Sequence, residues 1–320
     1  MTHILVPDNL EKIGLDLLTK ADGVTIQAPA KITRDEVLAI VEKADGLIIR
    51  SATKANAELL QRATNLKAIV RAGVGVDNVD LAKATELGIA VMNTPAGNTV
   101  ATAELAFSLM LALARHIPQA HASLLAGQWE RKAYMGTELR AKTLGLVGFG
   151  RIGQAVAKRA QAFDMTVVAY DPYIPAEVGR KLNVALLPLN EVLAQADYLS
   201  LHAVVSPETE NLINQATIAQ MKKGVRIVNA ARGSLINEVD LAEAVKSGKV
   251  AGAALDVYVE EPPKKDNPLI GLPGIIHTPH LGASTLEAQE AVAAEAAEIM
   301  LDALLRNEYR NVVNQGVKVG

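Results

Sequence analysis

Three polar residues in the second half of the chain have side chains that could move a proton and hold an anion. Arg232, Glu261 and His280 each follow a short apolar run that reads as a strand. Histidine titrates nearest neutrality, so His280 could remove a hydroxyl proton. Glu261 beside it would orient the imidazole and stabilise the imidazolium. Arg232 would hold a carboxylate and polarise a carbonyl oxygen through its bidentate fork. Together they suit a reaction in which an alcohol loses a proton and a hydride.

Each of these residues also has a simpler interpretation. A histidine at a strand end is often only a hydrogen-bonded structural residue, and His202 ends another apolar run, which makes it the serious rival of His280. Glu261 before Pro262 could be a solvated turn residue, and Arg232 before a glycine could be a charge at a strand end. Structural or surface roles are expected for three other histidines: His116, His121 and His277.

A glycine-rich turn of the form G-x-G-x-x-G precedes these residues in the chain. It follows the apolar run 143–147 and opens an Ala-rich amphipathic stretch, 154–163, so the segment reads as strand, turn and helix. Gly148 would make the turn, Gly150 would let the backbone approach a pyrophosphate, and Gly153 would let the helix pack on the strand. The phosphates would bind at the helix N-terminus. The simpler alternative is a glycine turn in another kind of α/β domain.

An acidic residue is placed to read the ribose of a dinucleotide. The apolar run 165–170 ends in Asp171, roughly 20 residues beyond the glycines, where a carboxylate can accept hydrogen bonds from the adenosine ribose hydroxyls. No arginine follows directly to receive a 2′-phosphate, since the next residues are Pro172 and Tyr173. The expected cofactor is therefore NAD rather than NADP, and no metal site is expected.

The elements that would position these residues form two α/β series. Strands of a small parallel sheet are expected at 4–6, 24–26, 46–50, 68–71 and 90–93. A long helix is expected over 98–115. Strands of a larger doubly wound sheet are expected at 143–147, 167–170, 198–202, 226–229, 252–257 and 275–278. A tail helix over 284–305, with Ser284 as N-cap and Glu287 completing a capping box, would return to the first sheet. We therefore expect one domain of 1–97 plus 285–320 and a second of 98–284.

Composition fits a soluble enzyme. The chain has 320 residues, of which 50% are apolar, and a net charge of -3 that argues against nucleic-acid binding. No apolar stretch reaches the roughly 20 residues of a membrane-spanning helix, and the first strand begins so early that no signal peptide is expected. The absence of cysteine excludes disulfides and thiolate catalysis, and a cytoplasmic location is the default.

Four segments together resemble the motif series of the D-isomer-specific 2-hydroxyacid dehydrogenases in order and spacing. They are Gly148-Phe-Gly-Arg-Ile-Gly153, Asn229-Ala-Ala-Arg-Gly233, Leu255-Asp-Val-Tyr-Val-Glu-Glu-Pro262 and Thr278-Pro-His-Leu-Gly-Ala-Ser284. The resemblance covers essentially the whole chain. It implies two Rossmann-like domains with the active site in the cleft between them, and Arg232, Glu261 and His280 as the catalytic set.

The resemblance also implies cofactor contacts and an assembly. Besides the three glycines, the implied NAD contacts are Arg151, Ile152, Asp171, His202, Ala230, Ala231, Arg232, Asp256, His280 and Gly282. Such enzymes are usually homodimers, or tetramers, with the helix near 98–115 in the interface. One departure is Ala203-Val204 after His202, where many members have proline second after the histidine. It puts a detail of the nicotinamide-side loop in doubt.

Motifs in the first domain, together with two segments of the second, are similar to the phosphoglycerate dehydrogenase branch of that family. They include Arg50-Ser-Ala-Thr-Lys54, the run from Arg71 to Asp80, the run from Asn93 to Asn98, and Trp129-Glu-Arg-Lys132 with Met135-Gly-Thr-Glu138. A phosphorylated substrate carries about two extra negative charges, which Arg50, Arg71, Arg131 and Lys132 could meet. The backbone N–H groups of the Gly73-Val-Gly75 turn could receive a carboxylate. The expected substrate contacts are Arg50, Ser51, Arg71, Val74, Gly75, Asn98, Arg131, Arg232 and His280.

The reaction implied is oxidation of 3-phospho-D-glycerate to 3-phosphohydroxypyruvate with NAD, and His280 as the base. Two alternatives remain open. One is a glyoxylate or hydroxypyruvate reductase on the same scaffold, which would need no phosphate site. The other is an NAD-sensing interaction protein of the kind found among corepressors that resemble this family. In the simplest view, Arg50, Arg131 and Lys132 carry ordinary surface charge.

Overall fold

The structure is a computed structural model that describes residues 1–318 of the 320 in the chain. Contacts within the chain divide it into two compact units, unit 1 with Met1–Asn98 and Thr285–Gly320, and unit 2 with Thr99–Ser284. Each unit is built on a parallel sheet, of five strands in unit 1 and seven in unit 2. The predicted α/β fold class, with two parallel sheets, is therefore confirmed.

The sheet of unit 1 has the order β2-β1-β3-β4-β5, which is that of flavodoxin-like sheets. All its pairs are parallel. Its strands are β1 (Thr2–Leu5), β2 (Val24–Gln27), β3 (Gly46–Ile49), β4 (Ala68–Arg71) and β5 (Ala90–Asn93). The whole of β3 is buried, because both faces of the sheet are covered.

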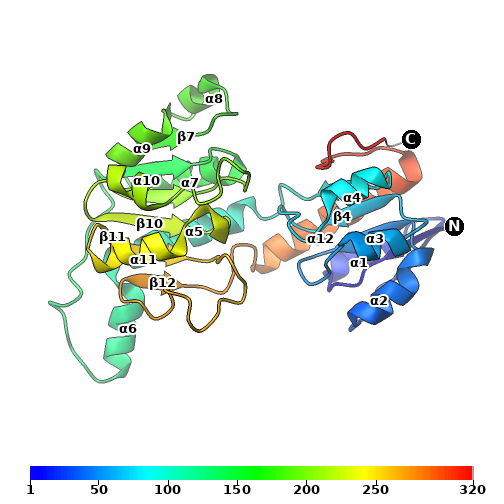
Figure 1. Cartoon of the computed structure of the whole chain (residues 1–320), viewed down its shortest axis with the longest axis horizontal. Coiled ribbons are helices and arrows are strands. Elements are labelled where there is room, and N and C mark those ends of the chain that lie inside the picture. Colours follow the sequence, from blue (N-terminus) through cyan, green and yellow to red (C-terminus); the bar gives the residue numbers. More distant parts are fainter. Residues whose placement is uncertain (319–320) are drawn as a thin grey trace. The chain divides into compact units, whose positions relative to one another are not determined.

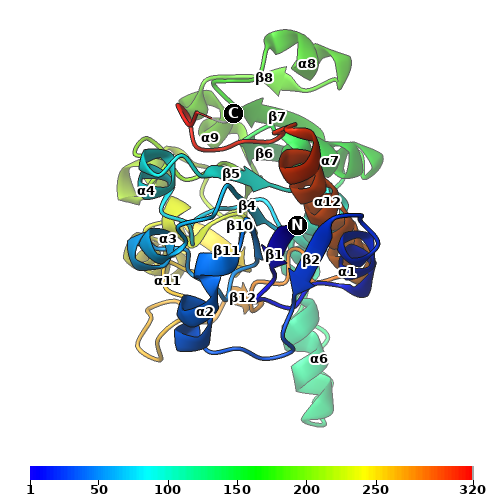
Figure 2. The same ribbon diagram turned by 90° about the vertical axis from the view of Figure 1, so that its right-hand side faces the viewer.

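Helices of unit 1 cover the two faces of its sheet. Leu47 and Ile49 of β3 pack in the cluster that includes α2 (Arg34–Ile40), α3 (Ala57–Arg62) and α4 (Leu81–Glu86). Ile48, between them, points to the other face, where α1 (Lys12–Thr19) and α12 (Leu286–Arg306) pack. Figure 2 shows the same division, with α1 and α12 on one side of the strands. A short 3-10 helix, η1 (Val41–Lys43), follows α2.

The start of α12 differs from the prediction. The N-cap is Thr285, whose side chain accepts a hydrogen bond from the N–H of Ala288, so the helix begins at Leu286. The predicted cap, Ser284, lies one residue too early. Because Glu287 is then the second helical residue rather than the third, the expected capping box is wrong.

The segment after α12 closes the open edge of this sheet. Val312 forms an antiparallel bridge with Met92. The buried side chain of Asn314 accepts from the N–H of Val91 at 2.8 Å and donates to the carbonyl of Ile89 at 2.9 Å. These groups pair the edge of β5 that would otherwise stay open.

The sheet of unit 2 has the order β12-β11-β10-β9-β6-β7-β8, all parallel. This contains the Rossmann order, with the direction of winding reversed between β6 and β9. The strands are β6 (Thr143–Val147), β7 (Thr166–Tyr170), β8 (Ala185–Leu186), β9 (Tyr198–Leu201), β10 (Val225–Asn229), β11 (Val250–Leu255) and β12 (Ile275–His277). The sequence did not predict β8, which has two residues.

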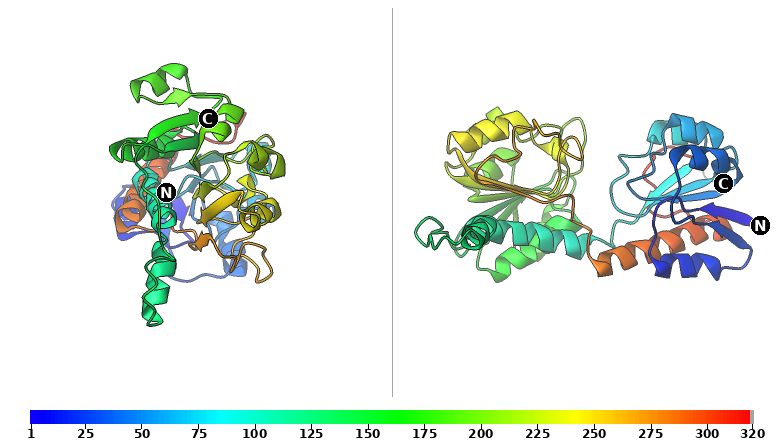
Figure 3. Two further views of the ribbon diagram at one scale, coloured as in Figure 1. Left: turned by 90° about the vertical axis from the view of Figure 1, so that its left-hand side faces the viewer. Right: turned by 90° about the horizontal axis from the view of Figure 1, so that it is seen from below.

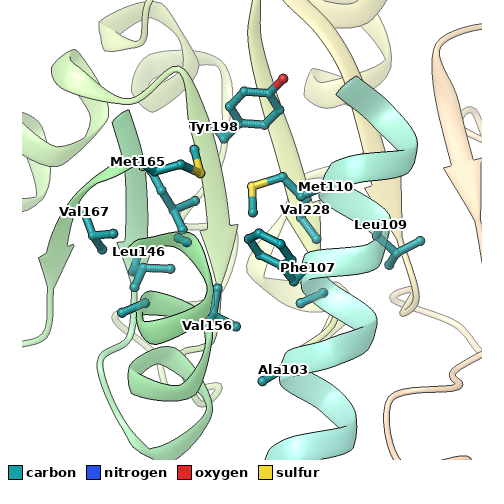
Figure 4. Packing of buried hydrophobic residues seen from close by; sticks show 14 of the residues in the cluster. Ala103, Phe107, Leu109, Met110, Leu146, Val156, Met165, Val167, Tyr198 and Val228 are labelled. Atoms are coloured by element: carbon teal, nitrogen blue, oxygen red, sulfur yellow. The ribbon is translucent and has the colours of Figure 1, made fainter. Parts of the chain in front are cut away.

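Two helical layers enclose this second sheet. On one face lie α5 (Thr99–Arg115) and α7 (Arg151–Ala162), and Figure 4 shows Phe107 and Met110 of α5 pointing toward Leu146, Val156 and Val228. On the other face lie α9 (Leu189–Gln195), α10 (Gln215–Gln220) and α11 (Glu238–Lys246). The right-hand view of Figure 3 shows α11 and α5 on opposite sides of these strands. Two further short elements of this unit are α8 (Ala176–Lys181) and η2 (Gly233–Leu235).

A helix that the sequence did not predict, α6 (Ile117–Leu125), follows α5 after His116 in the left-handed conformation. Figure 1 shows it projecting away from the sheet of unit 2. Its apolar side chains include exposed Ile117, Leu124 and Leu125. Within residues 1–318, no single helix is long and apolar enough to cross a membrane, although α5 and α6, bent by 62°, meet that test only when taken together.

Candidate active site

The predicted acid/base pair is in contact within unit 2. Nδ1 of His280 lies 2.6 Å from Oε2 of Glu261, and the two side chains are 51% and 37% exposed. Burial alone would raise the pKa of Glu261, but hydrogen bonds from His280 and from the N–H of Tyr258, with the charge of Arg232, hold it below its ordinary value. An ionised carboxylate can only accept, so Nδ1 carries the proton and Nε2 is the basic nitrogen of the neutral imidazole.

Asp256 fixes the turn that carries His280. Its fully buried carboxylate accepts from the N–H of Leu281 at 2.7 Å, the N–H of Gly282 at 2.9 Å and the hydroxyl of Thr278 at 2.6 Å. The N–H of His280 donates to the carbonyl of Asp256 at 2.8 Å. His280 itself has a left-handed φ of 55, which a non-glycine residue adopts only when its surroundings impose it.

The main chain of Tyr258 also holds Glu261, and the Tyr258 side chain is in turn in contact with His277. The N–H of Tyr258 donates to Oε1 of Glu261 at 3.1 Å, and the Tyr258 hydroxyl lies 2.7 Å from Nδ1 of His277. Burial, followed by the charge of Asp256, raises the pKa of Tyr258 to about 12. Burial also lowers the pKa of His277. Tyr258 and His277 are therefore both uncharged at the near-neutral pH at which the Glu261–His280 pair would act.

Arg232 stands on a turn directly after β10. The buried side chain of Asn229 accepts from the N–H of Ala231 at 3.1 Å and donates to the carbonyl of Arg232 at 2.8 Å. A Cβ on Gly233 would lie 1.9 Å from the carbonyl carbon of Tyr258, so only glycine fits there. The turn after β10 and the loop after β11 are thus in direct contact, which holds Arg232 close to the segment that carries Glu261.

His202, the rival histidine, lies in a different setting. Its Nε2 is 2.9 Å from the hydroxyl of Ser200, and among the described residues its buried Nδ1 has no partner. Burial lowers its pKa to about 4. Its backbone packs against the glycine turn, where a Cβ on Gly148 would lie 2.5 Å from the carbonyl carbon of His202. The residue supports the glycine turn and has no carboxylate beside its ring in the described chain.

The glycine turn has the features that a dinucleotide requires. Gly150 is the N-cap of α7, no side chain caps that helix, and a Cβ on Gly150 would meet nothing within 4 Å. Gly153 packs so closely that a Cβ would lie 2.4 Å from the carbonyl oxygen of Gly148. The first N–H groups of α7, from Arg151 and Ile152 onward, are therefore open to an anion, as pyrophosphate binding demands.

Asp171 follows β7 and is anchored at this turn. Its Oδ2 accepts from the N–H of Phe149 at 2.8 Å, and its Oδ1 accepts from the N–H of Tyr173 at 2.9 Å. Each carboxylate oxygen has a further lone pair for a hydroxyl donor. Of the other expected cofactor contacts, Ala230 is buried beside Asn229, Ala231 is half-buried, and Gly282 is buried on Asp256.

The expected substrate residues of unit 1 follow the carboxyl ends of its strands. Arg50 and Ser51 follow β3, and Arg71 ends β4. The Arg71 guanidinium occupies the space beside Gly73, whose Cβ would lie 1.4 Å from Nη1. Nδ2 of Asn93 donates to the carbonyl of Val74 at 2.7 Å and so holds the turn that leads to Gly75. Asn98 stands directly before α5, and Arg131 lies in an exposed loop of unit 2.

Sequence reasoning missed the residues that hold the site together. Within unit 2 the structure brings Glu261, His280 and Asp256 together and sets Arg232 close enough for its charge to act on Glu261. The missed positioning residues are Asn229, Tyr258, His277 and Thr278. Two signals were available: all four are polar residues at or just beyond strand ends, and Asn229, Tyr258 and Thr278 lie within the motif segments that resemble the family.

Comparisons with known proteins agree with this geometry. Residues 107–282 match the family described as D-isomer specific 2-hydroxyacid dehydrogenase, NAD binding domain. The D-3-phosphoglycerate dehydrogenase of Methanocaldococcus jannaschii is 49% identical over 316 residues, which are 98% of this chain and 60% of that protein. The chain thus spans about 60% of the length of the curated relatives that it matches.

Solved structures show the same relationship over nearly the whole chain. A Thermus thermophilus protein, TT0316, superposes with a TM-score of 0.88 at 39% identity, covering 98% of this chain and 100% of that one. A glyoxylate reductase from Paecilomyes thermophila also gives a TM-score of 0.88, at 30% identity, over 98% of each chain. The chain therefore belongs to the D-isomer-specific 2-hydroxyacid dehydrogenase family, and unit 2 is that family's NAD-binding domain.

Proposed function

We propose that this protein is an NAD-dependent dehydrogenase that oxidises 3-phospho-D-glycerate to 3-phosphohydroxypyruvate, a step of L-serine biosynthesis in the cytoplasm. The proposed reaction type rests on the 2.6 Å contact between Glu261 and His280, which lies on a turn fixed by Asp256. The proposed substrate rests on the 49% identity to the D-3-phosphoglycerate dehydrogenase of Methanocaldococcus jannaschii.

The reaction removes two hydrogens from the substrate in different forms. Nε2 of His280 takes the proton of the C2 hydroxyl, because Nδ1 already donates to Glu261. When bound, NAD supplies the acceptor for the hydride that leaves C2 with its electron pair. Glu261 stabilises the imidazolium that forms, and Arg232 binds the substrate carboxylate and polarises the developing carbonyl.

In this proposal NAD binds along the carboxyl edge of the unit 2 sheet. Support comes from the open first turn of α7, the space beside Gly150 and the anchored carboxylate of Asp171. Arg151 and Ile152 would offer N–H groups to the pyrophosphate, and Asp171 would accept from the ribose hydroxyls. Ala230, Ala231, Asp256 and Gly282 would lie at the nicotinamide end.

The substrate phosphate would be met by arginines of unit 1. Among residues 1–318, the Arg50 guanidinium forms no salt bridge with a carboxylate, and it is oriented by Gln289 and by the carbonyl of Asn9. Such an arginine is free to bind a dianion in a chain whose net charge is -3. Arg71, with Val74 and Gly75 beyond it, would hold the carboxylate end, and Ser51, Asn98 and Arg131 would complete the set.

The exposed apolar surface of α6 and the loop after it supports a homodimer. Leu125, Trp129 and Met135 are 76%, 76% and 79% exposed in the single chain. Large apolar side chains so exposed mark association surfaces. Sedimentation equilibrium should therefore give the mass of a dimer or a tetramer, and Leu125→Lys should shift that mass toward the monomer.

A reductase acting on glyoxylate or hydroxypyruvate is the second candidate, favoured by the similarity to the fungal glyoxylate reductase. Steady-state kinetics separates the two. NADH formation with 3-phosphoglycerate, compared with NADH consumption with hydroxypyruvate and with glyoxylate, should give the highest kcat/KM on the phosphorylated acid. Arg50→Ala should abolish that advantage. Turnover of the unphosphorylated ketoacids alone would move the function to the reductase, and no turnover would reject both.

A further inference from the structure

The loop of residues 50–53 is held by two side chains from outside it. The carboxylate of Asp8 accepts from the N–H of Arg50 at 2.6 Å, the N–H of Thr53 at 3.1 Å and the Thr53 hydroxyl at 2.6 Å. Nδ2 of Asn78 donates to the carbonyl of Arg50 at 2.6 Å and to that of Thr53 at 2.7 Å. The main-chain groups at both ends of the loop are thereby satisfied.

The origin of these two residues explains how they reach the loop. The loop follows β3, which lies between β1 and β4 in the sheet. Asp8 follows β1, and Asn78 belongs to the segment after β4. Each neighbouring strand therefore contributes one residue at the carboxyl edge, where parallel sheets bind their ligands.

The middle of the loop is left with unpaired donors. In the part of the chain that the structure describes, the N–H groups of Ser51 and Ala52 donate to no protein acceptor, and both residues are exposed. Arg50 directly precedes these two residues in the chain. Phosphate oxygens accept hydrogen bonds from donors of these kinds, namely two backbone N–H groups, a serine hydroxyl and an arginine.

We propose that Asp8 and Asn78 are positioning residues that hold loop 50–53 in the form that binds the substrate phosphate, and that they thereby set the preference for a phosphorylated hydroxy acid. The inference rests on the proposed function. A loop held at both ends needs no ordering when the ligand arrives, so its donors contribute fully to binding. Both residues bond to loop 50–53 and neither belongs to the proposed catalytic set, so their loss should act on phosphate binding alone.

Two ketoacids that differ only in the phosphate provide the test. Reduction of 3-phosphohydroxypyruvate and of hydroxypyruvate with NADH is measured for Asn78→Asp and Asp8→Asn, which keep the side-chain shape but remove donors or an acceptor. The ratio of the two kcat/KM values should fall about tenfold or more, and kcat on hydroxypyruvate should stay within about twofold. The inhibition constant of inorganic phosphate should rise in parallel.

A milder variant and a matched control keep the result interpretable. Thr53→Val removes one bond to Asp8 without changing shape and should lower the ratio about threefold. Asn314→Asp makes the same chemical change in unit 1, at a residue that also bonds main-chain groups, but at the start of β5. It should lower the melting temperature and leave the ratio unchanged.

The outcomes separate this inference from the function on which it rests. If the unsubstituted protein shows no preference for the phosphorylated ketoacid, the proposed substrate is wrong. If the preference is present, but folded Asn78→Asp, Asp8→Asn and Thr53→Val keep it or lose activity on both ketoacids equally, the positioning role is wrong while the function stands. A loss confined to the phosphorylated ketoacid supports both.

Discussion

Glu261 binds His280 through one carboxylate oxygen, at 2.6 Å, and the N–H of Tyr258 through the other, at 3.1 Å. Both oxygens are therefore occupied, and the carboxylate cannot rotate away from the imidazole without breaking a second bond. The proton on Nδ1 is fixed by this arrangement, which leaves Nε2 as the basic nitrogen in the proposed reaction.

Replacing Glu261 should change the pH dependence of the reaction. Hydrogen bonds from His280 and from the N–H of Tyr258 hold the pKa of Glu261 below its ordinary value despite burial, so its protonation does not limit the rate near neutrality. In Glu261→Gln the imidazolium loses its negative neighbour, and the acidic limb of kcat/KM for alcohol oxidation should move to lower pH. We also expect kcat/KM to fall about 100-fold. An unchanged limb, measured from pH 6 to pH 10, would remove Glu261 from the site.

Asp256→Asn should lower activity through the turn that carries His280. The amide can accept at only one oxygen, so one of the N–H groups of Leu281 and Gly282 loses its partner. We expect kcat/KM to fall about 10-fold to 100-fold, with a lower melting temperature. The matched control is Asp197→Asn, whose carboxylate accepts from the N–H of Thr143 at 2.8 Å in the same unit. Equal losses of activity in the two variants would contradict a specific role of Asp256.

Asp171→Ala should weaken the preference for NAD. The carboxylate is anchored by the N–H groups of Phe149 and Tyr173, and its remaining lone pairs are expected to accept from the ribose. Its removal should raise KM for NAD about 10-fold to 100-fold and leave KM for NADP less affected. The ratio of kcat/KM for the two cofactors measures this directly, with the exposed Glu177→Gln as control. A ratio equal to that of the unsubstituted protein would exclude the ribose role.

The stability of the protein should depend on His202 in mildly acidic solution. Its folded-state pKa is about 4, against 6.5 for the free side chain. Above pH 6.5 both states are neutral and its contribution is complete; as pH falls, the unfolded chain takes up the proton first and the free energy of unfolding decreases. We expect a loss on the order of 1 to 2 kcal/mol between pH 7 and pH 5, reduced because the residue is only half-buried.

Urea unfolding of His202→Gln tests that prediction. The amide nitrogen of glutamine can occupy the position of Nε2 beside Ser200 but does not titrate. The difference in unfolding free energy between pH 7 and pH 5 should therefore be smaller in the variant. If it is the same in both proteins, the folded pKa of His202 is not depressed.

Hydrophobic patterning was sufficient to predict the two sheets. The run Gly46 to Ile49 is buried throughout, because strands covered on both faces carry continuous apolar runs. The elements that were missed gave little signal. β8 has only two residues, and α6 follows α5 after a single left-handed residue, His116, at a point where the pattern of the long helix ended.

The candidate site was predictable where topology alone brings residues together. Glu261 and His280 follow adjacent strands of one sheet, so their meeting could be expected from the strand order. The supporting contacts could not. Asp8 meets Arg50 from 42 positions away, and Asp256 reaches Gly282 from 26 positions away. Nothing in the local sequence distinguishes these carboxylates from solvated turn residues.

The most direct test of the proposed mechanism is the kcat of His280→Asn with 3-phosphoglycerate and NAD. The asparagine amide can still donate to Glu261 in place of Nδ1, but the variant has no base at the position of Nε2. The mechanism predicts a fall of at least about 1,000-fold in kcat for a protein that melts at nearly the same temperature. A folded variant with kcat nearly unchanged would show that His280 is not the base.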